Sequence, residues 1–196
     1  MKTIKSACFL KSETDFKNYK GFGYPEIVFA GRSNVGKSSL INLIANNGKL
    51  AKVSATQGKT KLVNFFLFND EFLLVDLPGY GYASAGKDEQ ERWAKMINCY
   101  LENSKQIKCA ILLVDIRHTP TKQDIQILDY FTFNNIPVTI VATKLDKIKN
   151  SEKQRNLANI SATLKVGINN IFVVSAEKKI GRDELVQRIY QFIDGE

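Results

Sequence analysis

Short apolar runs alternate along the chain with longer stretches in which apolar residues recur at helical spacing. Six runs have the length and composition of buried strands: residues 26–30, 61–68, 71–76, 109–115, 137–143 and 170–175. Amphipathic stretches predict helices over residues 88–103, 121–134, 151–165 and 181–193. Because strands that alternate with helices indicate βαβ units, the pattern predicts an α/β fold with a mostly parallel sheet.

One connection departs from this alternation. Only Asn69 and Asp70 separate the runs 61–68 and 71–76, and so short a connection joins antiparallel strands as a hairpin. We therefore expect a six-stranded sheet with one antiparallel strand and helices on both faces. The lysine-rich residues 1–22 are expected to form an N-terminal extension with at most a short strand or turn, and residues 23–196 a single domain.

The composition is that of a globular protein with a basic surface. Hydrophobic residues make up 44% of the chain, charged residues 24%, and the net charge is +8. This balance favours contact with a nucleotide, RNA or an acidic membrane surface, although a solvated lysine-rich surface gives the same charge. The cysteines show no disulfide or zinc spacing, and no apolar run has the length of a membrane span, so we expect a cytoplasmic protein.

The residues Gly31–Ser38 carry the most specific chemistry in the chain. Their pattern, GRSNVGKS, fits the phosphate-binding loop G-x-x-x-x-G-K-[ST], and it lies between a predicted strand and a predicted helix. Backbone N–H groups at a helix N-terminus form an anion site, and glycines let the backbone approach a phosphate closely. Lys37 is expected at the β- and γ-phosphates and the Ser38 hydroxyl at Mg²⁺. The alternative is a glycine-bearing turn that begins a helix.

Two further segments suit the phosphate end of such a site. Asp76 ends an apolar strand and is followed by Leu77, Pro78 and Gly79, so its carboxylate is placed to bind Mg²⁺ directly or through water. The Gly79 N–H could meet the γ-phosphate, whereas the alternative for this segment is a simple turn. In the loop 56–61, Thr60 is expected to give its hydroxyl to Mg²⁺ and its N–H to the γ-phosphate.

Two strand ends suit recognition of a base. Asp146 follows the predicted strand 137–143 in the sequence Thr143-Lys144-Leu145-Asp146, and its carboxylate can accept both hydrogens that guanine presents at N1 and the 2-amino group. Adenine has a bare lone pair at the matching place and would leave the carboxylate unpaired. After the strand 170–175, Ser175, Ala176 and Glu177 would let backbone N–H groups approach the base.

In this order the motifs resemble those of translation-factor-class GTPases. More narrowly, the stretches Gly31–Asn42, Asp76–Ala83 (DLPGYGYA) and Val114–His118 resemble the EngB/YihA/YsxC family of bacterial GTPases, over about residues 20–193. The resemblance implies a Ras-like P-loop GTPase fold, binding of GTP and GDP with Mg²⁺, and a role in assembly of the large ribosomal subunit. It also implies a link to cell division and septation.

Carried over to this sequence, the resemblance assigns the nucleotide and metal contacts. The nucleotide contacts are Gly31, Arg32, Ser33, Asn34, Val35, Gly36, Lys37 and Ser38; Gly58, Lys59, Thr60, Lys61 and Leu62; Asp76, Leu77, Pro78 and Gly79; Thr143, Lys144, Leu145 and Asp146; and Ser175, Ala176 and Glu177. Mg²⁺ falls on Ser38 and Thr60, with Asp76 beside them. Thr143 departs from the pattern, because many GTPases have asparagine there, and it lacks the amide.

For hydrolysis, the candidate catalytic residues are Lys37, Thr60, Gly79 and Asn34. Tyr80 stands where Ras-type enzymes place a water-orienting glutamine, so we expect slow intrinsic turnover, on the order of 10⁻⁴ to 10⁻³ s⁻¹, that a partner accelerates. Related GTPases with asparagine at the Asn34 position use K⁺, so Asn34 either supports K⁺ stimulation or only shapes the loop.

The expected partner is a large-subunit precursor and its RNA, bound by a monomer, with Arg117 and His118 contributing to a partner surface. Two other functions stay open. One is a nucleotide-dependent protein-interaction switch at the division machinery without ribosomal RNA contact. The other is a P-loop ATPase or small-molecule kinase, against which the base motif ending in Asp146 argues.

Overall fold

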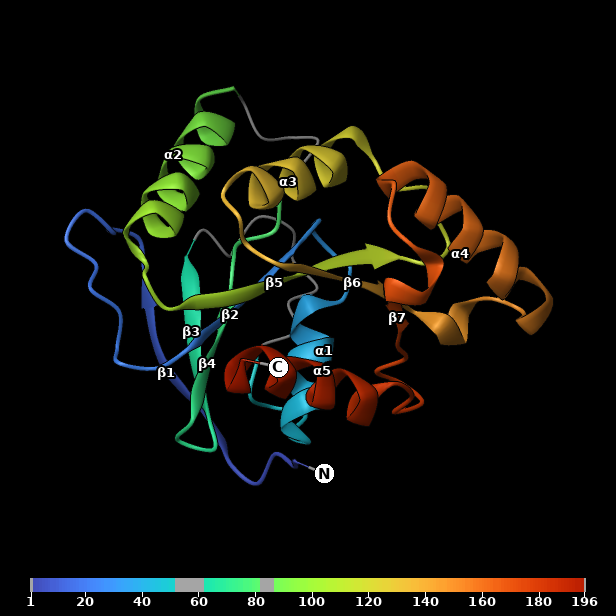
Figure 1. The fold of residues 1–196 in the computed structure, drawn as a ribbon, viewed down its shortest axis with the longest axis horizontal. Helices are drawn as coiled ribbons and strands as arrows, with labels where there is room; N and C mark the ends of the chain where they lie inside the picture. The colour runs from blue at the N-terminus through green and yellow to red at the C-terminus, as the bar shows by residue number, and fades with distance from the viewer. Residues whose placement is uncertain (1, 52–61, 82–86, 196) are drawn as a thin grey trace.

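A seven-stranded sheet lies between two layers of helices in the computed structural model (Figure 1). The structure describes residues 2–51, 62–81 and 87–195, with the side chains of 87–90 excepted. The strands are β1 (Ala7–Glu13), β2 (Glu26–Gly31), β3 (Val63–Phe68), β4 (Phe72–Asp76), β5 (Ile107–Asp115), β6 (Val138–Thr143) and β7 (Ile171–Val173). Their order across the sheet is β1-β3-β4-β2-β5-β6-β7.

The helices divide between the two faces of this sheet. Those of the described residues are α1 (Lys37–Ala45), α2 (Lys87–Asn103), α3 (Lys122–Phe133), α4 (Asn150–Leu164) and α5 (Arg182–Asp194), with short 3₁₀ turns η1 (Leu145–Lys147) and η2 (Ile168–Asn170). Helices α1 and α5 cover one face, and α2, α3 and α4 cover the other (Figure 1). The central strands β2 and β4 are buried along their whole length, which explains why they are continuously apolar rather than alternating.

The expected hairpin is confirmed. Strands β3 and β4 pair antiparallel, and the connecting residues Asn69 and Asp70 have φ values of 53° and 54°. Two left-handed residues in a row give the twist that a two-residue hairpin needs, and asparagine and aspartate tolerate that region better than most residues. In direction, β3 is the one antiparallel strand of the sheet, as the pattern predicts.

The expected count of six strands is wrong, because residues 7–13 form a full strand. β1 pairs with β3 along the edge of the sheet, with an irregularity in register between Phe9 and Lys11. Phe9 packs edge-on against Phe66, with ring centroids 5.7 Å apart, yet it stays half-exposed. An edge strand with mostly exposed side chains has no strong apolar alternation, which is why the sequence pattern does not reveal it.

At the opposite end of the sheet from its carboxyl edge, β2 begins with a buried carboxylate. Glu26 is completely shielded from solvent and accepts hydrogen bonds from the hydroxyls of Tyr19 (2.6 Å), Tyr100 (2.7 Å) and Ser104 (2.7 Å). These donors come from the segment before β2, from α2 and from the turn after α2. The cluster therefore connects the N-terminal segment and α2 to the start of the central strand.

Among the described residues, no helix has the length and apolarity needed to cross a membrane.

Candidate nucleotide-binding site

The glycine-rich loop connects the end of β2 to the start of α1. Asn34 and Gly36 have positive φ values of 62° and 109°, and Gly36 occupies the N-cap position of α1 without a side-chain cap. A Cβ atom on Gly31 would lie 2.8 Å from Val35 Cγ1 and 3.1 Å from the Leu113 carbonyl oxygen, so only glycine fits there. The loop therefore presents uncapped backbone N–H groups at a helix N-terminus, which is a site for a phosphate.

Lys37 and Asp76 face each other at this end of the sheet. The Lys37 ammonium lies 4.0 Å from Asp76 Oδ1, and both side chains are almost completely buried. Asp76 Oδ1 has no hydrogen-bond partner among the described residues. Burial raises the pKa of the Asp76 carboxyl, and Lys37 and Asn64 only partly offset this effect. A buried carboxylate oxygen without a partner suits a cation ligand.

Mg²⁺ binds to oxygen ligands, often one or two carboxylates together with phosphate oxygens and water. The described residues contain no cluster of three or more histidine, cysteine or acidic side chains, so a metal here would depend on such a mixed set. Ser38, in the first turn of α1, and Asp76 supply oxygens of the right kind. The donor chemistry therefore fits Mg²⁺.

The predicted residues Gly58, Lys59, Thr60 and Lys61 lie outside the described residues, and Leu62 lies just before β3.

Gly79 lies directly against the phosphate loop. A Cβ atom there would be 3.0 Å from the Ser33 nitrogen and 3.2 Å from Lys37 Nζ. The Ser33 N–H donates to the Tyr80 carbonyl at 2.9 Å, and the Trp93 indole N–H donates to the Pro78 carbonyl at 2.9 Å. The segment Asp76–Gly79 is therefore held between the loop and α2, and the close approach requires glycine.

The Tyr80 side chain is directed toward the start of α3. Its hydroxyl donates to Asp124 Oδ1 at 2.7 Å, and its side chain is 7% exposed. The other oxygen of Asp124 accepts from the backbone and hydroxyl of Thr121 at the start of α3. Burial and the neighbouring Asp124 raise the pKa of the Tyr80 phenol, so it stays protonated. In this conformation the phenol serves packing against α3 rather than the phosphate end.

The end of β6 is connected to the phosphate loop by two side chains. The buried Thr143 hydroxyl donates to the Val35 carbonyl at 2.7 Å, so threonine makes a backbone contact without the amide that many GTPases have there. Lys144, at φ 64°, places its ammonium 2.7 Å from the Asn34 carbonyl and 2.9 Å from Asp115 Oδ2. The two loops therefore form one connected unit.

Asp115 is a member of the site that the sequence did not reveal. It ends β5 and accepts two hydrogen bonds from the Arg117 guanidinium, at 2.9 and 2.7 Å, besides its ion pair with Lys144. Burial alone would raise the pKa of Asp115, but the bonds from Arg117 and Lys144 hold that pKa well below its usual range. A strand-ending aspartate after a long apolar run, followed closely by arginine, is the available signal.

Asp146 is held in place from both sides. Its Oδ1 accepts from the Ser175 hydroxyl at 2.6 Å, and the Lys147 ammonium lies 3.1 Å from its Oδ2. The Ser175 hydrogen bond lowers the pKa of Asp146, with Lys147 adding to the effect against burial. Lys147 in turn pairs with Glu177 at 2.6 Å, and the Leu145 N–H donates to the Val174 carbonyl. A charged, oriented carboxylate therefore lies at the ends of β6 and β7.

The predicted segments within the described residues thus meet at the carboxyl edge of the sheet, where open α/β sheets bind their ligands. The fold and this arrangement define the class of P-loop GTPases. Comparisons with known proteins agree, because residues 26–144 match the family described as "50S ribosome-binding GTPase".

Relatives narrow the assignment. The chain is 50% identical over 187 residues to a probable GTP-binding protein EngB of Clostridium acetobutylicum, covering 95% of this chain and 94% of that protein. It is 46% identical over 188 residues to a probable EngB of Clostridium beijerinckii, covering 95% of each. The chain therefore belongs to the EngB family of GTP-binding proteins.

Solved structures give the same picture. A crystal structure of a probable GTP-binding protein EngB has a TM-score of 0.74 and 28% identity, covering 87% of this chain and all of that one. A structure of an Aquifex aeolicus Era variant bound to GDP·AlF₄⁻ has a TM-score of 0.66 and 23% identity, covering 85% of this chain and 56% of that one. The second likeness supports the fold alone.

Proposed function

We propose that this protein is a Mg²⁺-dependent GTPase switch that binds a precursor of the large ribosomal subunit and leaves it after hydrolysis. One observation carries the proposal. Lys37, Asp76 and Gly79, which are proposed to face the phosphates, lie at the same edge of the sheet as Asp146, which is proposed to face the base. The family description, "50S ribosome-binding GTPase", and the net charge of +8 support the ribosomal part. A role in division and septation belongs to the same proposal.

The proposed contacts follow the geometry. Loop N–H groups of residues 31–38 bind the phosphates, and the Lys37 ammonium stabilises charge that develops on the transferred phosphoryl group. Asp146 accepts from guanine, with Ser175 holding the carboxylate in orientation. Ser38, Thr60 and Asp76 would hold Mg²⁺, which would neutralise negative charge on the phosphates. The remaining predicted contacts, at residues 58–62, 77–79, 143–145 and 175–177, are part of this proposal.

We also propose that intrinsic hydrolysis is slow, and the conformation of Tyr80 supports this. Its hydroxyl is engaged by Asp124, so no side chain at this position orients a water molecule. A partner or K⁺ would then supply the missing stabilisation. For K⁺, the candidate ligand is Asn34, whose side chain is exposed while Lys144 holds its carbonyl. Single-turnover rates that are equal in NaCl and KCl would exclude the K⁺ role.

The base assignment is tested by Asp146→Asn. An amide presents a donor to the guanine N1–H and loses one acceptor, whereas xanthine offers an oxygen at the position of the 2-amino group. We expect GDP affinity to fall by about 10³-fold or more and xanthosine diphosphate to bind in its place. Isothermal titration with both nucleotides measures this exchange. Unchanged GDP affinity, or ATP competing as well as GTP, would contradict the assignment.

The ribosomal part is tested separately by nucleotide-dependent co-sedimentation. Wild-type protein with a non-hydrolysable GTP analogue should sediment with large-subunit precursors, and the Lys37→Ala variant should not. Because phosphate contacts release counterions, binding should weaken steeply as salt rises. Salt-insensitive binding, or co-purification with division proteins without RNA, would favour the protein-interaction switch instead.

A further inference from the structure

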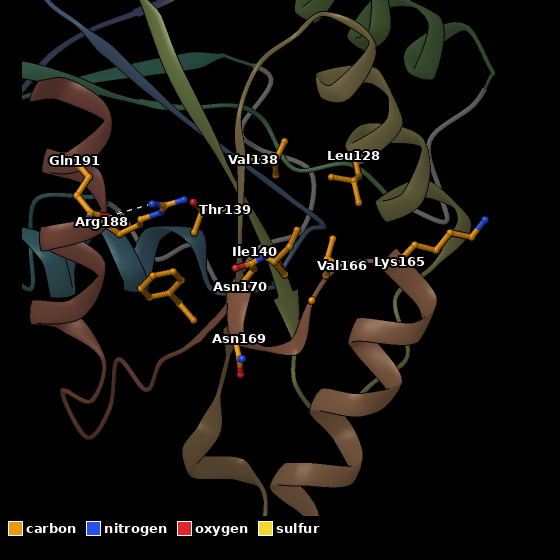
Figure 2. A pocket seen from close by; sticks show the side chains of 12 residues that line it. Leu128, Val138, Thr139, Ile140, Lys165, Val166, Asn169, Asn170, Arg188 and Gln191 are labelled. Atoms are coloured by element: carbon orange, nitrogen blue, oxygen red, sulfur yellow. Dashed lines mark hydrogen bonds between the residues drawn. The ribbon is translucent and has the colours of Figure 1, made fainter. Parts of the chain in front are cut away.

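A second cavity lies away from the nucleotide site, at the amino-terminal end of β6 (Figure 2). Its volume is about 560 Å³, within the range of roughly 300–1,000 Å³ that is usual for small-molecule sites. In the sheet register β7 begins opposite Ile140, so Val138 and Thr139 extend beyond the end of β7. The chain between Lys165 and Asn170 lines the space that the short strand leaves.

One wall of the cavity contains a buried hydroxyl without a partner. Thr139 is 3% exposed, and its Oγ1 has no hydrogen-bond partner among the described residues. Buried polar side-chain atoms are nearly always hydrogen-bonded, because an unsatisfied one loses its interaction with water and gains nothing in return. Thr139 lines the cavity, so a molecule inside could supply the partner after a local movement that exposes the shielded Oγ1.

The charge of the lining is positive. Of the described residues that line the cavity, Arg188 of α5 and Lys165 are charged, and none is aspartate or glutamate. The Arg188 side chain is held by a 3.1 Å hydrogen bond to Gln191 Oε1 and lies 4.4 Å from the Phe192 ring centroid. It makes no ion pair with a described carboxylate. Figure 2 shows Arg188 and Thr139 on the same side of the cavity.

The other wall is apolar. Side chains of Leu128, Val138, Ile140 and Val166 lie together on the far side from Arg188 (Figure 2). The cavity thus combines an oriented cation and an unpartnered hydroxyl on one side with a hydrocarbon surface on the other. Sites for small molecules join apolar surface to placed polar groups, and this cavity has both, with Asn169, Asn170 and Gln191 adding to its polar part.

We propose that this cavity binds a small organic anion, with its charged group at Arg188 and Thr139 and its apolar body against the opposite wall. A guanidinium suits both phosphate and carboxylate, because its N–H groups form paired hydrogen bonds with either. The Thr139 hydroxyl then donates to the same anion and gains its missing partner. This site is separate from the GTP site and does not depend on the proposed ribosomal function.

The test uses the full chain loaded with GDP and Mg²⁺, so that the phosphate loop is filled. Phenyl phosphate and phenylacetate are titrated in ¹H–¹⁵N NMR experiments, which distinguish the two anion sources. Inorganic phosphate and benzyl alcohol are the controls for charge alone and for apolar body alone. We expect saturable shifts at residues 138–140 and 165–172 for at least one aromatic anion, with a dissociation constant on the order of 1 mM. Each control should bind at least about tenfold more weakly.

Variants show which groups make the site. Arg188→Gln should weaken binding about tenfold, whereas Arg155→Gln, the same change on the exposed face of α4, should leave it unaltered. Thr139→Val should weaken binding several-fold and yet leave the melting temperature of the free protein equal or higher, because the free hydroxyl has no partner to lose.

Four results would overturn the proposal. They are shifts confined to the phosphate loop, benzyl alcohol binding as tightly as the anions, unaltered binding in Arg188→Gln, and no saturable shift with either aromatic anion.

Discussion

Two buried carboxylates on neighbouring strands behave in opposite ways. Glu26 begins β2 and Asp76 ends β4, and the strands pair in parallel, so the two lie at opposite ends of the sheet. Glu26 accepts three hydrogen bonds from hydroxyl groups. Asp76 has an oxygen without a partner among the described residues, and its pKa is raised by burial.

The difference separates a structural carboxylate from one that awaits a ligand. Surrounding hydroxyls satisfy the buried carboxyl group of Glu26 with hydrogen bonds, and nothing further needs to bind there. Asp76 Oδ1 lacks a partner among the described residues, and the cation proposed above would supply one. An unsatisfied buried carboxylate at a strand's carboxyl end is thus a stronger sign of function than burial alone.

Removal of the Glu26 carboxyl group, which accepts three hydrogen bonds, should have the largest effect on stability. Glu26→Leu leaves the buried hydroxyls of Tyr100 and Ser104 without their acceptor, so the free energy of unfolding should fall by about 3–5 kcal/mol. Urea unfolding followed by circular dichroism measures this change. GDP affinity of the folded fraction should stay the same. Unchanged stability would mean that the hydroxyl cluster contributes little, and the contrast with Asp76 would fail.

In contrast to Glu26→Leu, Asp76→Asn should impair GTP turnover more than stability. Turnover of GTP should fall by about 10²–10³-fold, measured in single-turnover assays across a Mg²⁺ titration. The free energy of unfolding of the nucleotide-free protein should change by only about 1 kcal/mol, because the lower cost of burying a neutral amide is offset by the loss of the ion pair with Lys37.

The pH dependence gives a control for this variant. The folded-state pKa of Asp76 lies above its ordinary value of 3.8, so the folded state binds the proton more tightly than the unfolded state does. Stability of the nucleotide-free wild type should therefore decrease as pH rises from 3.8 toward the folded pKa. The Asn variant should lack this component. An identical pH profile in both proteins would show that Asp76 is compensated after all.

The smallest effect is expected at Tyr80. Tyr80→Phe leaves one oxygen of the buried Asp124 without its donor, so the free energy of unfolding should fall by about 1 kcal/mol. Single-turnover hydrolysis should stay within about threefold of the wild type, because the Tyr80 hydroxyl is already engaged by Asp124. The Tyr80→Ala variant checks the whole side chain, and a hundredfold loss of rate there would place Tyr80 in the hydrolysis step.

Sequence patterns predicted the parts of this molecule that depend on local geometry. The Asn69–Asp70 hairpin follows from connection length and from residues that tolerate positive φ, and the phosphate loop follows from its glycine spacing. The buried central strands were visible as continuous apolar runs. Parallel strands all end at one edge of the sheet. The sequence therefore also predicted that Lys37, Asp76 and Asp146 lie at that edge.

The parts that were missed depend on partners far away in the chain. β1 is stabilised by pairing with β3, at least 50 residues later, and its own side chains are mostly exposed. The role of Asp115 depends on Lys144, and the direction of Tyr80 depends on Asp124. No local pattern carries that information, because each contact exists only once the sheet has formed.

The Lys144 side chain has a consequence for nucleotide affinity. Its ammonium joins the loop that would hold the base to the carbonyl of Asn34 in the loop that would hold the phosphates. The spacing between the two halves of the site is therefore fixed before any ligand arrives. A nucleotide that spans both loops would lose its own freedom on binding but would not have to order the loops relative to each other. Part of the affinity for a whole nucleotide would thus already be prepared in the free protein, by a contact between the two loops.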